Sequence, residues 1–483
     1  MTPLLGFAPD MESPTSGMLV DCDQFVPYQT GMEAAPSPST PTSVPVLLSD
    51  CRGAVVATKT DGTRRVIAGT TVGLYELSSG TWNNQSSATY TGGSDSRWSF
   101  AQFGDSTIAS NRADAMQVST STTFSAVGGS APKAQIVYAV GSQVMALNVN
   151  DGAEKTDGWH CCAIFDASDW VEAVATQSAS GRLVSSPGPI TAGMRLGEYA
   201  TAYKAGAVYL GQYVGAPSVW DWLQVSGGDA GCVGKEAICD IDGAHFFVGT
   251  GNFWIFDGTR PVPIGDQQVR QWFFDNADSA NLHKTKCVYD RQQNRVWIYY
   301  PSAGTSTCNS TLVYHLKSQQ WGRANRAIEA TLNYVSSGVT IDGLASISST
   351  IRGLPDISFD SAYWLAGAHS LAIFNTSHQL QTYTGDPDDS SFTTGDAGDD
   401  DAVTLLKQIR LRFAAGRAPT TGSVSTAHKM SSGDSYSTGM SGVLNDGKFD
   451  VMRSARWHRA TVSFTGSVRV TGINPTFEAA GQR

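Results

Sequence analysis

A strand–turn–strand unit that recurs without an exact repeat places the strongest constraint on how this chain folds. In each copy a short apolar strand meets a turn containing Gly, Asn or Asp, and a second strand rich in aromatic residues follows. Clear copies occupy residues 69–82, 246–258 and 288–321. Units of a few short strands, spaced roughly 40–50 residues apart, are typical of a β-propeller. One such unit cannot bury both of its faces, so it must stack on neighbours around a central axis.

The composition agrees with an all-β fold. The 483 residues include 50 glycines, 12 Trp, 16 Tyr and 19 Phe, and only 16% are charged. No amphipathic helix pattern exceeds about two turns. We therefore predict a β-propeller of six or seven blades, with an extended N-terminal arm and a small C-terminal β domain. The visible blade starts lie near Ala54, Trp98, Ile136, Tyr199, Ala237, Cys287 and Ala362. Radial closure leaves an axial hole, which we interpret as a passive conduit.

Composition divides the chain into four regions. Residues 1–48 hold eight of the 19 prolines, five acidic residues and no Lys or Arg, which indicates an extended Pro-rich arm. Its apolar residues favour an arm that lies along a neighbouring subunit, and a disordered tail is the alternative. Residues 49–385 hold the propeller. Residues 386–401 form an acidic loop with seven Asp, and residues 402–483 form a C-terminal β domain with eleven basic and four acidic residues.

No motif for catalysis or cofactor binding stands out. The stretch 249–254 begins like a dinucleotide-binding loop but lacks the final glycine and a following helix, so we interpret it as a hairpin turn. The acidic loop lacks the ligand spacing of a calcium site. The eight cysteines show no metal-binding spacing, and we expect buried free thiols. We predict no enzyme activity, no cofactor and no metal, although a glycosidase carboxylate pair has no sequence signature that would exclude it.

The charge and the N-terminus restrict where the protein works. A net charge of −10 argues against a surface that grips nucleic acid. The first residues lack the segments of a signal peptide, and no apolar run approaches the roughly 20 residues of a membrane span. We therefore expect a soluble protein made in a cytoplasm. The acidic N-terminal arm and the basic C-terminal region would steer one subunit onto another.

Short segments along nearly the whole chain occur in an order that is typical of one family. They include LGFAPD at 5–10, RWSFAQFGD at 97–105, VRQWFF at 269–274 and RWHR at 456–459. In this collinear order the chain resembles the tail nozzle proteins of short-tailed bacteriophages, which are also called tail-hub or packaged-DNA stabilisation proteins.

The resemblance implies a structural virion protein rather than an enzyme. It implies a homo-hexameric ring below the portal and adaptor rings, in the virion tail, assembled in the host cytoplasm. Tail fibres or spikes would attach nearby. Genome double-stranded DNA would be retained by the ring and then ejected through its channel without sequence-specific binding. The alternative is a propeller tail protein that binds or degrades glycans.

Two groups of residues are candidate functional sites. Aromatic and Arg residues anchor interfaces, so the candidates for a subunit or domain contact are Arg456, Trp457, His458 and Arg459. A strand that packs on its own core is the alternative. Carboxylates repel the DNA backbone, so the candidates for a channel gate are Asp399, Asp400 and Asp401. A solvated acidic loop is the alternative for this second group.

Overall fold

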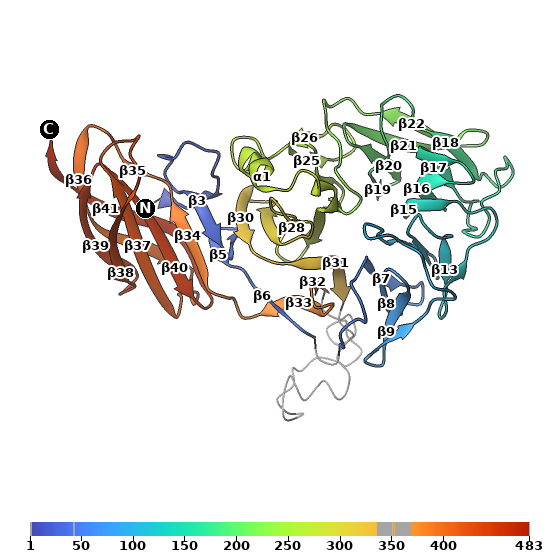
Figure 1. Cartoon of the computed structure of the whole chain (residues 1–483), viewed down its shortest axis with the longest axis horizontal. Coiled ribbons are helices and arrows are strands. Elements are labelled where there is room, and N and C mark those ends of the chain that lie inside the picture. Colours follow the sequence, from blue (N-terminus) through green and yellow to red (C-terminus); the bar gives the residue numbers. More distant parts are fainter. Residues whose placement is uncertain (1, 42–43, 336–349, 351, 353–368, 483) are drawn as a thin grey trace.

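The computed structural model describes residues 2–41, 44–335, 350, 352 and 369–482. Its regular structure is nearly all β, and the strands form two bodies, a propeller and a sandwich beside it (Figure 1). The prediction of an all-β propeller is confirmed by the sheet topology. None of the helices in these residues is long and apolar enough to cross a membrane.

The first three blades follow one another along the chain. Blade 1 contains β7 (Ala54–Thr58), β8 (Arg64–Gly69), β9 (Leu74–Ser78) and β10 (Thr81–Asn84). Blade 2 contains β11 (Ser99–Phe103), β12 (Ser106–Ser110), β13 (Gln117–Ser119) and β14 (Ser125–Ala126). Blade 3 contains β15 (Lys133–Val140), β16 (Gln143–Asn150), β17 (Glu154–Cys161) and β18 (Ala179–Arg182).

The next three blades repeat the same four-stranded antiparallel plan. Blade 4 contains β19 (Ala192–Leu196), β20 (Tyr199–Lys204), β21 (Ala207–Gly215) and β22 (Val219–Gln224). Blade 5 contains β23 (Ile238–Asp240), β24 (His245–Val248), β25 (Phe253–Phe256) and β26 (Val262–Pro263). The helices α1 (Arg270–Asn276) and η1 (Leu282–Lys284) lead to blade 6. Blade 6 contains β27 (Lys286–Asp290), β28 (Arg295–Tyr300), β29 (Ser310–His315) and β30 (Gln320–Ala324).

Blade 7 joins distant parts of the chain and closes the ring. It contains β31 (Ile328–Val335), β32 (His369–Asn375), β33 (Leu380–Gly385) and, as its outer strand, β6 (Ser37–Ser39). The first strands of the blades contact one another in a closed cycle, from β7 through β11, β15, β19, β23 and β27 to β31 and back to β7. Among the described residues, six separate four-stranded sheets and the four strands of blade 6 therefore surround one axis.

The predicted blade starts differ from the observed ones at two places. Tyr199 begins the second strand of blade 4, because the first strand, Ala192–Leu196, carries a weak β pattern in its Ala-Gly-Met sequence. Ala362 lies outside the described residues, and blade 7 begins at Ile328. The other five starts lie in or next to a first strand.

Both faces of a blade are covered by neighbouring blades. Cys161 and Cys162, next to each other at the end of β17, are both fully buried. Their side chains enter different apolar clusters, one shared with blade 4 and one shared with blade 2. Neighbouring residues on a strand point to opposite faces, and here both faces are covered, so neither side chain is exposed. In a sheet with one solvated face, one of the two would be exposed. All eight cysteines are buried and unpaired.

The second body is a sandwich that joins the two ends of the chain. One sheet contains β2 (Gly6–Phe7), β3 (Met18–Asp23), β34 (Ser390–Thr394), β35 (Ala397–Gly398), β37 (Thr421–Lys429), β38 (Ser437–Val443) and β40 (Trp457–Thr465). The other contains β1 (Thr2–Pro3), β4 (Phe25–Tyr28), β5 (Gly31–Ala34), β36 (Ala402–Phe413), β39 (Lys448–Ala455) and β41 (Arg469–Gln482). Phe25, Phe392 and Phe464 pack between the sheets with ring centroids 5.3–6.3 Å apart.

The N-terminal arm differs from the extended arm that we expected. Its strands β1–β6 all pair within this chain. β6 is the edge strand of its sheet, which is a position where proline is tolerated. The apolar residues that suggested a neighbouring subunit, such as Phe25 and Met32, are buried in the sandwich core. The segment 386–401 also differs from a simple loop, because it contains β34 and β35.

The arm also ties the sandwich to the propeller. β4 pairs with β30 of blade 6, and β5 pairs with β4 and β41, so blade 6 and one sandwich sheet form a single ten-stranded sheet. Glu33 on β5 sits at this junction. Its carboxylate accepts from Arg295 of blade 6 and from Arg469 of β41, where the Nη2–Oε2 distance is 2.6 Å. Arg295 is 1% exposed, so this ion pair is shielded from solvent.

We expect Glu33→Gln to weaken the junction. Removing one partner of a shielded ion pair leaves two arginines without their carboxylate and costs about 3 kcal/mol of unfolding free energy. Urea denaturation followed by tryptophan fluorescence measures the loss. The matched control is Asp450→Asn, which removes an exposed pair with Lys448 and costs about 0.5 kcal/mol or less. Equal effects of the two substitutions would contradict a special role for Glu33.

Candidate functional site

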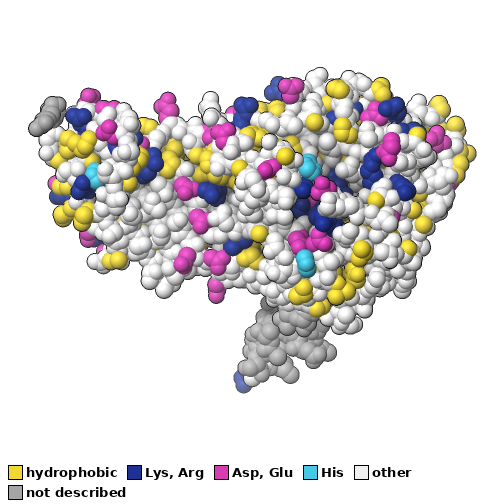
Figure 2. Space-filling view, viewed as in Figure 1, with side chains coloured by type: hydrophobic (Ala, Val, Ile, Leu, Met, Phe, Trp, Pro, Cys, Tyr) yellow, Lys and Arg dark blue, Asp and Glu magenta, His cyan; other side chains and the backbone are white. Residues whose placement is uncertain are grey.

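A charged cavity opens at the propeller axis, where the first strands of the blades begin. Its volume is about 1210 Å³, and segments of every blade line it. Among the described residues its wall includes seven Lys or Arg and five Asp or Glu. Figure 2 shows these charges gathered at a hollow in the middle of the propeller. We call this cavity the axial pocket.

The blade plan explains why the charges meet there. The first strand of each blade is innermost, so the residues just before that strand point to the axis. Charged residues recur at this position, at Arg97 before β11, at Glu236 before β23 and at Lys284 before β27. They are far apart in the sequence and come together only when the ring closes.

Arg97 forms the floor of the axial pocket by reaching across the ring. Its Nε and Nη2 atoms lie 3.0 and 3.1 Å from the Glu236 carboxylate in blade 5. Nη2 also donates to the Glu329 carbonyl in blade 7 at 2.7 Å, and Nη1 donates to the Cys51 carbonyl before blade 1 at 3.2 Å. One guanidinium therefore links four blades. The axis is crossed by this group rather than open, so our interpretation of a conduit through the propeller is wrong.

Glu236 stays ionised because cations surround it. Burial alone would raise its pKa, but Arg97, Lys286 and Lys235 outweigh that effect and lower the pKa to about 2. The Lys286 ammonium lies 3.0 Å from its carboxylate. The geometry is that of a structural ion-pair network, with each charge compensated at short range.

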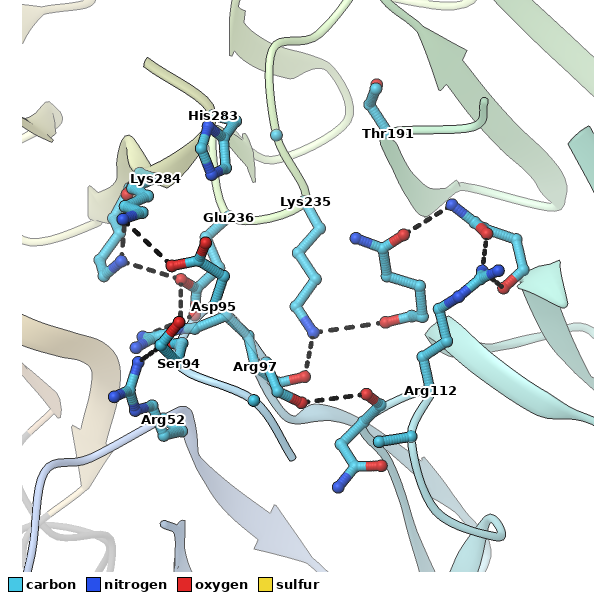
Figure 3. A pocket seen from close by; sticks show the side chains of 18 of the residues that line it. Arg52, Ser94, Asp95, Arg97, Arg112, Thr191, Lys235, Glu236, His283 and Lys284 are labelled. Carbon is cyan, nitrogen blue, oxygen red and sulfur yellow. Dashed lines mark hydrogen bonds and ion pairs between the residues drawn. The ribbon is translucent and has the colours of Figure 1, made fainter. Parts of the chain in front are cut away.

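Lys235 lies beside this network in the middle of the pocket (Figure 3). Its ammonium donates to the carbonyl oxygen of Arg97 and, at 3.3 Å, to that of Gln135 in blade 3. Burial lowers its pKa to about 7; Glu236 opposes this shift, while Arg97 and Lys286 add to it. Lys235 therefore gives up its proton more readily than an ordinary lysine.

Further ion pairs border the pocket. Asp95 pairs with Lys284 at 3.1 Å, which joins the segment before blade 2 to the segment before blade 6. Arg112 contacts Glu154 and Asn148 on the other side of the pocket (Figure 3). Within the described part of the chain, no group of three or more His, Cys, Asp or Glu is arranged to hold a metal ion.

The predicted contact residues lie in the sandwich, and two of the four are buried. Trp457 and His458 are buried on β40, and His458 Nε2 lies 3.1 Å from the Thr404 hydroxyl. Arg459 donates to the Asp396 carboxylate at 2.8 Å. Arg456 is only partly exposed. Trp457 and His458 pack within the sandwich, while Arg456 and Arg459 are partly exposed, and a contact with another subunit stays a prediction.

The predicted gate residues occupy the turn between β35 and β36 of the sandwich. The Asp399 carboxylate caps that turn by accepting from the backbone N–H groups of Asp401 and Ala402 at 2.9 and 2.7 Å. Asp400 accepts from the Trp457 indole at 2.6 Å, and hydrogen bonds from Trp457 and Ser432 lower its pKa. None of the three lines the axial pocket. The structure brings the two predicted groups together through Asp400 and Trp457.

Exposed apolar side chains occur near both ends of the molecule, and we name the two sets the sandwich surface and the propeller surface. The sandwich surface is formed by Met430, Met440, Val443 and Met452. The propeller surface, on blades 3 and 4, is formed by Phe165, Val171, Val174, Val184, Tyr213, Val214 and Leu223. In Figure 1, β18 and β22 lie at the far end of the propeller from β38 and β39. Sequence analysis did not identify either surface, because exposure is decided by the packing of other elements.

Comparisons with known proteins concern the fold alone. Neither a family model nor a curated protein matches this sequence. Among solved structures, one described as YCF48 bound to D1 peptide shares 12% identity with a TM-score of 0.36, covering 72% of this chain and 95% of its own. YCF48 from Cyanidioschyzon merolae shares 12% identity with a TM-score of 0.38, covering 63% and 94%. We draw no functional argument from likeness at this level.

We expect Glu236→Gln to change how stability depends on pH. In the native protein the pKa of Glu236 is about 2, below its ordinary value of 4.5. Its stabilising contribution is therefore complete above about pH 4.5 and is lost as the pH falls toward 2. At pH 7 the variant should lose about 3 kcal/mol of unfolding free energy. Its unfolding free energy, measured by urea titrations, should also fall less steeply as the pH is lowered, and we call this fall the acid limb. Asp95→Asn, at an exposed pair, is the control, with an expected cost below about 1 kcal/mol. An unchanged acid limb would count against the assignment.

Proposed function

We propose that this protein is a structural subunit of a short-tailed bacteriophage virion, and that copies of it form the tail nozzle ring. The ring retains packaged DNA and later releases it. The proposal starts from the collinear resemblance along the chain. The observation that carries it further is that exposed apolar side chains, the sandwich surface and the propeller surface, occur near both ends of one elongated molecule.

The two surfaces suit a head-to-tail contact between copies. Around the propeller surface, residues 155–184 contain four acidic and two basic residues, and one of the basic residues, Arg182, pairs with Asp157. The sandwich surface belongs to residues 402–483, where eleven basic residues face four acidic ones. Arg453 beside Met452 is exposed and contacts His428 rather than a carboxylate. Opposite charges around apolar centres favour association. Head-to-tail contacts generate a ring when the rotation from each copy to the next brings the last copy back to the first.

In this proposal the DNA channel runs between subunits and not through a propeller. The axial pocket is crossed by the Arg97–Glu236 pair. This pair leaves no open path for a duplex along the propeller axis. A net charge of −10 per subunit keeps DNA mobile in the channel, because few phosphates are neutralised.

We expect assembly to depend on the sandwich surface. Full-length protein mixed with the adaptor–portal complex should form a six-fold ring, measured by light scattering and electron microscopy. The variant Met440→Lys with Val443→Lys adds charge to the apolar centre and should reduce ring formation at least tenfold. Val72→Lys, at an exposed apolar residue of blade 1, is the control. A protein that stays monomeric, does not bind the adaptor–portal complex, and binds or cleaves oligosaccharide would favour the glycan alternative.

The gate proposal has its own test. If Asp399, Asp400 and Asp401 line the channel, replacing all three with Asn removes repulsion of DNA phosphates and slows DNA release from assembled particles. Asn keeps the side-chain length, so the cap formed by Asp399 is largely retained. Asp434→Asn, at another exposed residue of the sandwich, is the control. Release at the native rate would remove these residues from the mechanism.

A further inference from the structure

The carboxylates of the axial pocket are all engaged within the protein. Each of the five contacts a cation or a backbone donor at short range. Three pair with a single cation: Asp50 with Arg52, Asp95 with Lys284, and Glu154 with Arg112. The other two have two partners each: Glu236 contacts Arg97 and Lys286, and Glu329 contacts His378 and the Cys51 N–H. These contacts account for five of the seven Lys and Arg that line the pocket.

Lys133 and Lys235 are the two lining cations left over. Lys133 Nζ donates to the Ala113 carbonyl at 2.7 Å, and Lys235 donates to the carbonyls of Arg97 and Gln135. In the part of the chain that the structure describes, neither ammonium forms an ion pair with a carboxylate. An ammonium has three N–H donors, so each has donor capacity beyond these carbonyl contacts.

The fold brings the two lysines to the same wall. Lys133 and Gln135 are two residues apart on β15, and both line the axial pocket. Lys235 reaches that strand from blade 5 by donating to the Gln135 carbonyl. Lys133 is exposed, while Lys235 is partly buried. The wall therefore carries one cation open to solvent and one deeper cation.

We propose that the axial pocket binds a small phosphate-bearing molecule whose phosphate lies between Lys133 and Lys235. A phosphate monoester carries nearly two negative charges near neutral pH and offers three acceptor oxygens, which matches two cations that lack carboxylate partners. The cavity of about 1210 Å³ has room for more than the phosphate, since ligand pockets measure roughly 300–1,000 Å³. Amide and hydroxyl side chains at Asn111, Asn150 and Thr376 also line it. This inference does not depend on the proposed role in a virion.

Proton uptake gives the proposal a distinctive signature. The charged groups that act on Lys235 are Glu236, Arg97 and Lys286, and burial lowers its pKa to about 7. In the empty pocket the amine therefore loses its proton at a lower pH than an ordinary lysine does. A bound dianion favours the protonated form and raises the pKa. Binding at pH 8 is then accompanied by uptake of a proton.

Isothermal titration calorimetry of the full chain at pH 8 tests this directly. The probes are inorganic phosphate, glucose 6-phosphate and, as the neutral control, glucose, all at matched ionic strength. We expect both phosphates to bind and glucose not to bind. The binding enthalpy should differ between Tris and HEPES, whose ionisation enthalpies differ, in the direction of proton uptake. Binding of glucose as tight as that of its phosphate, or no binding by either phosphate, would overturn the proposal.

Variants separate the pocket from general charge effects. Lys133→Gln and Lys235→Met should each weaken glucose 6-phosphate binding at least tenfold, and Lys235→Met should also abolish the buffer dependence. Lys133 is exposed, so its variant reports on binding even if Lys235→Met folds poorly. Lys448→Gln, at a sandwich lysine away from the pocket, is the matched control. A loss in this control equal to that of Lys133→Gln would overturn the assignment. The assay uses no virion component, so its result is independent of ring formation.

Discussion

The ion-pair network at the propeller axis is the interaction on which the ring most depends. Backbone ladders hold each blade together, and apolar side chains pack blade on blade. At the axis, Arg97 alone contacts groups before or within blades 1, 5 and 7, and Lys235 continues the contacts to blade 3. Shielded charges cost desolvation energy, which is offset only when each finds its partners. The network therefore favours the one closed arrangement in which all partners meet.

A second constraint comes from the N-terminal arm, which joins parts of the chain that are remote in sequence. β6 meets β33 across more than 340 residues, as the Ser39–Thr382 hydrogen bond shows. Glu33 links blade 6 to the last strand of the sandwich. Closing such long loops costs entropy before any contact compensates for it. The arm thus makes ring closure and sandwich formation parts of one folding event, and it holds the two bodies in one continuous sheet.

Much of the fold was predictable, because alternation, turn residues and aromatic content are local properties. The starts near Ala54 and Cys287 lie at first strands, since each begins a short β-rich run. The candidate sites were harder. Trp457 and Asp400 were chosen for different roles, yet they form a hydrogen bond with each other at the turn between β35 and β36. The axial pocket was missed because its residues come from every blade. The charged residues just before blades 2, 5 and 6 were the signal in the sequence that could have indicated the pocket.

The sequence by itself determined an all-β chain of stacked blades, because each short sheet carries too much apolar surface to exist alone. It also determined the separation of charge between the ends of the chain. Only the tertiary structure decided that the Pro-rich arm folds back into its own chain, and that Arg97 and Glu236 cross the axis. It alone left Lys133 and Lys235 without an ion pair to a carboxylate among the described residues. The physical reason is that burial and charge compensation depend on contacts between residues hundreds of positions apart, and no local pattern encodes these contacts.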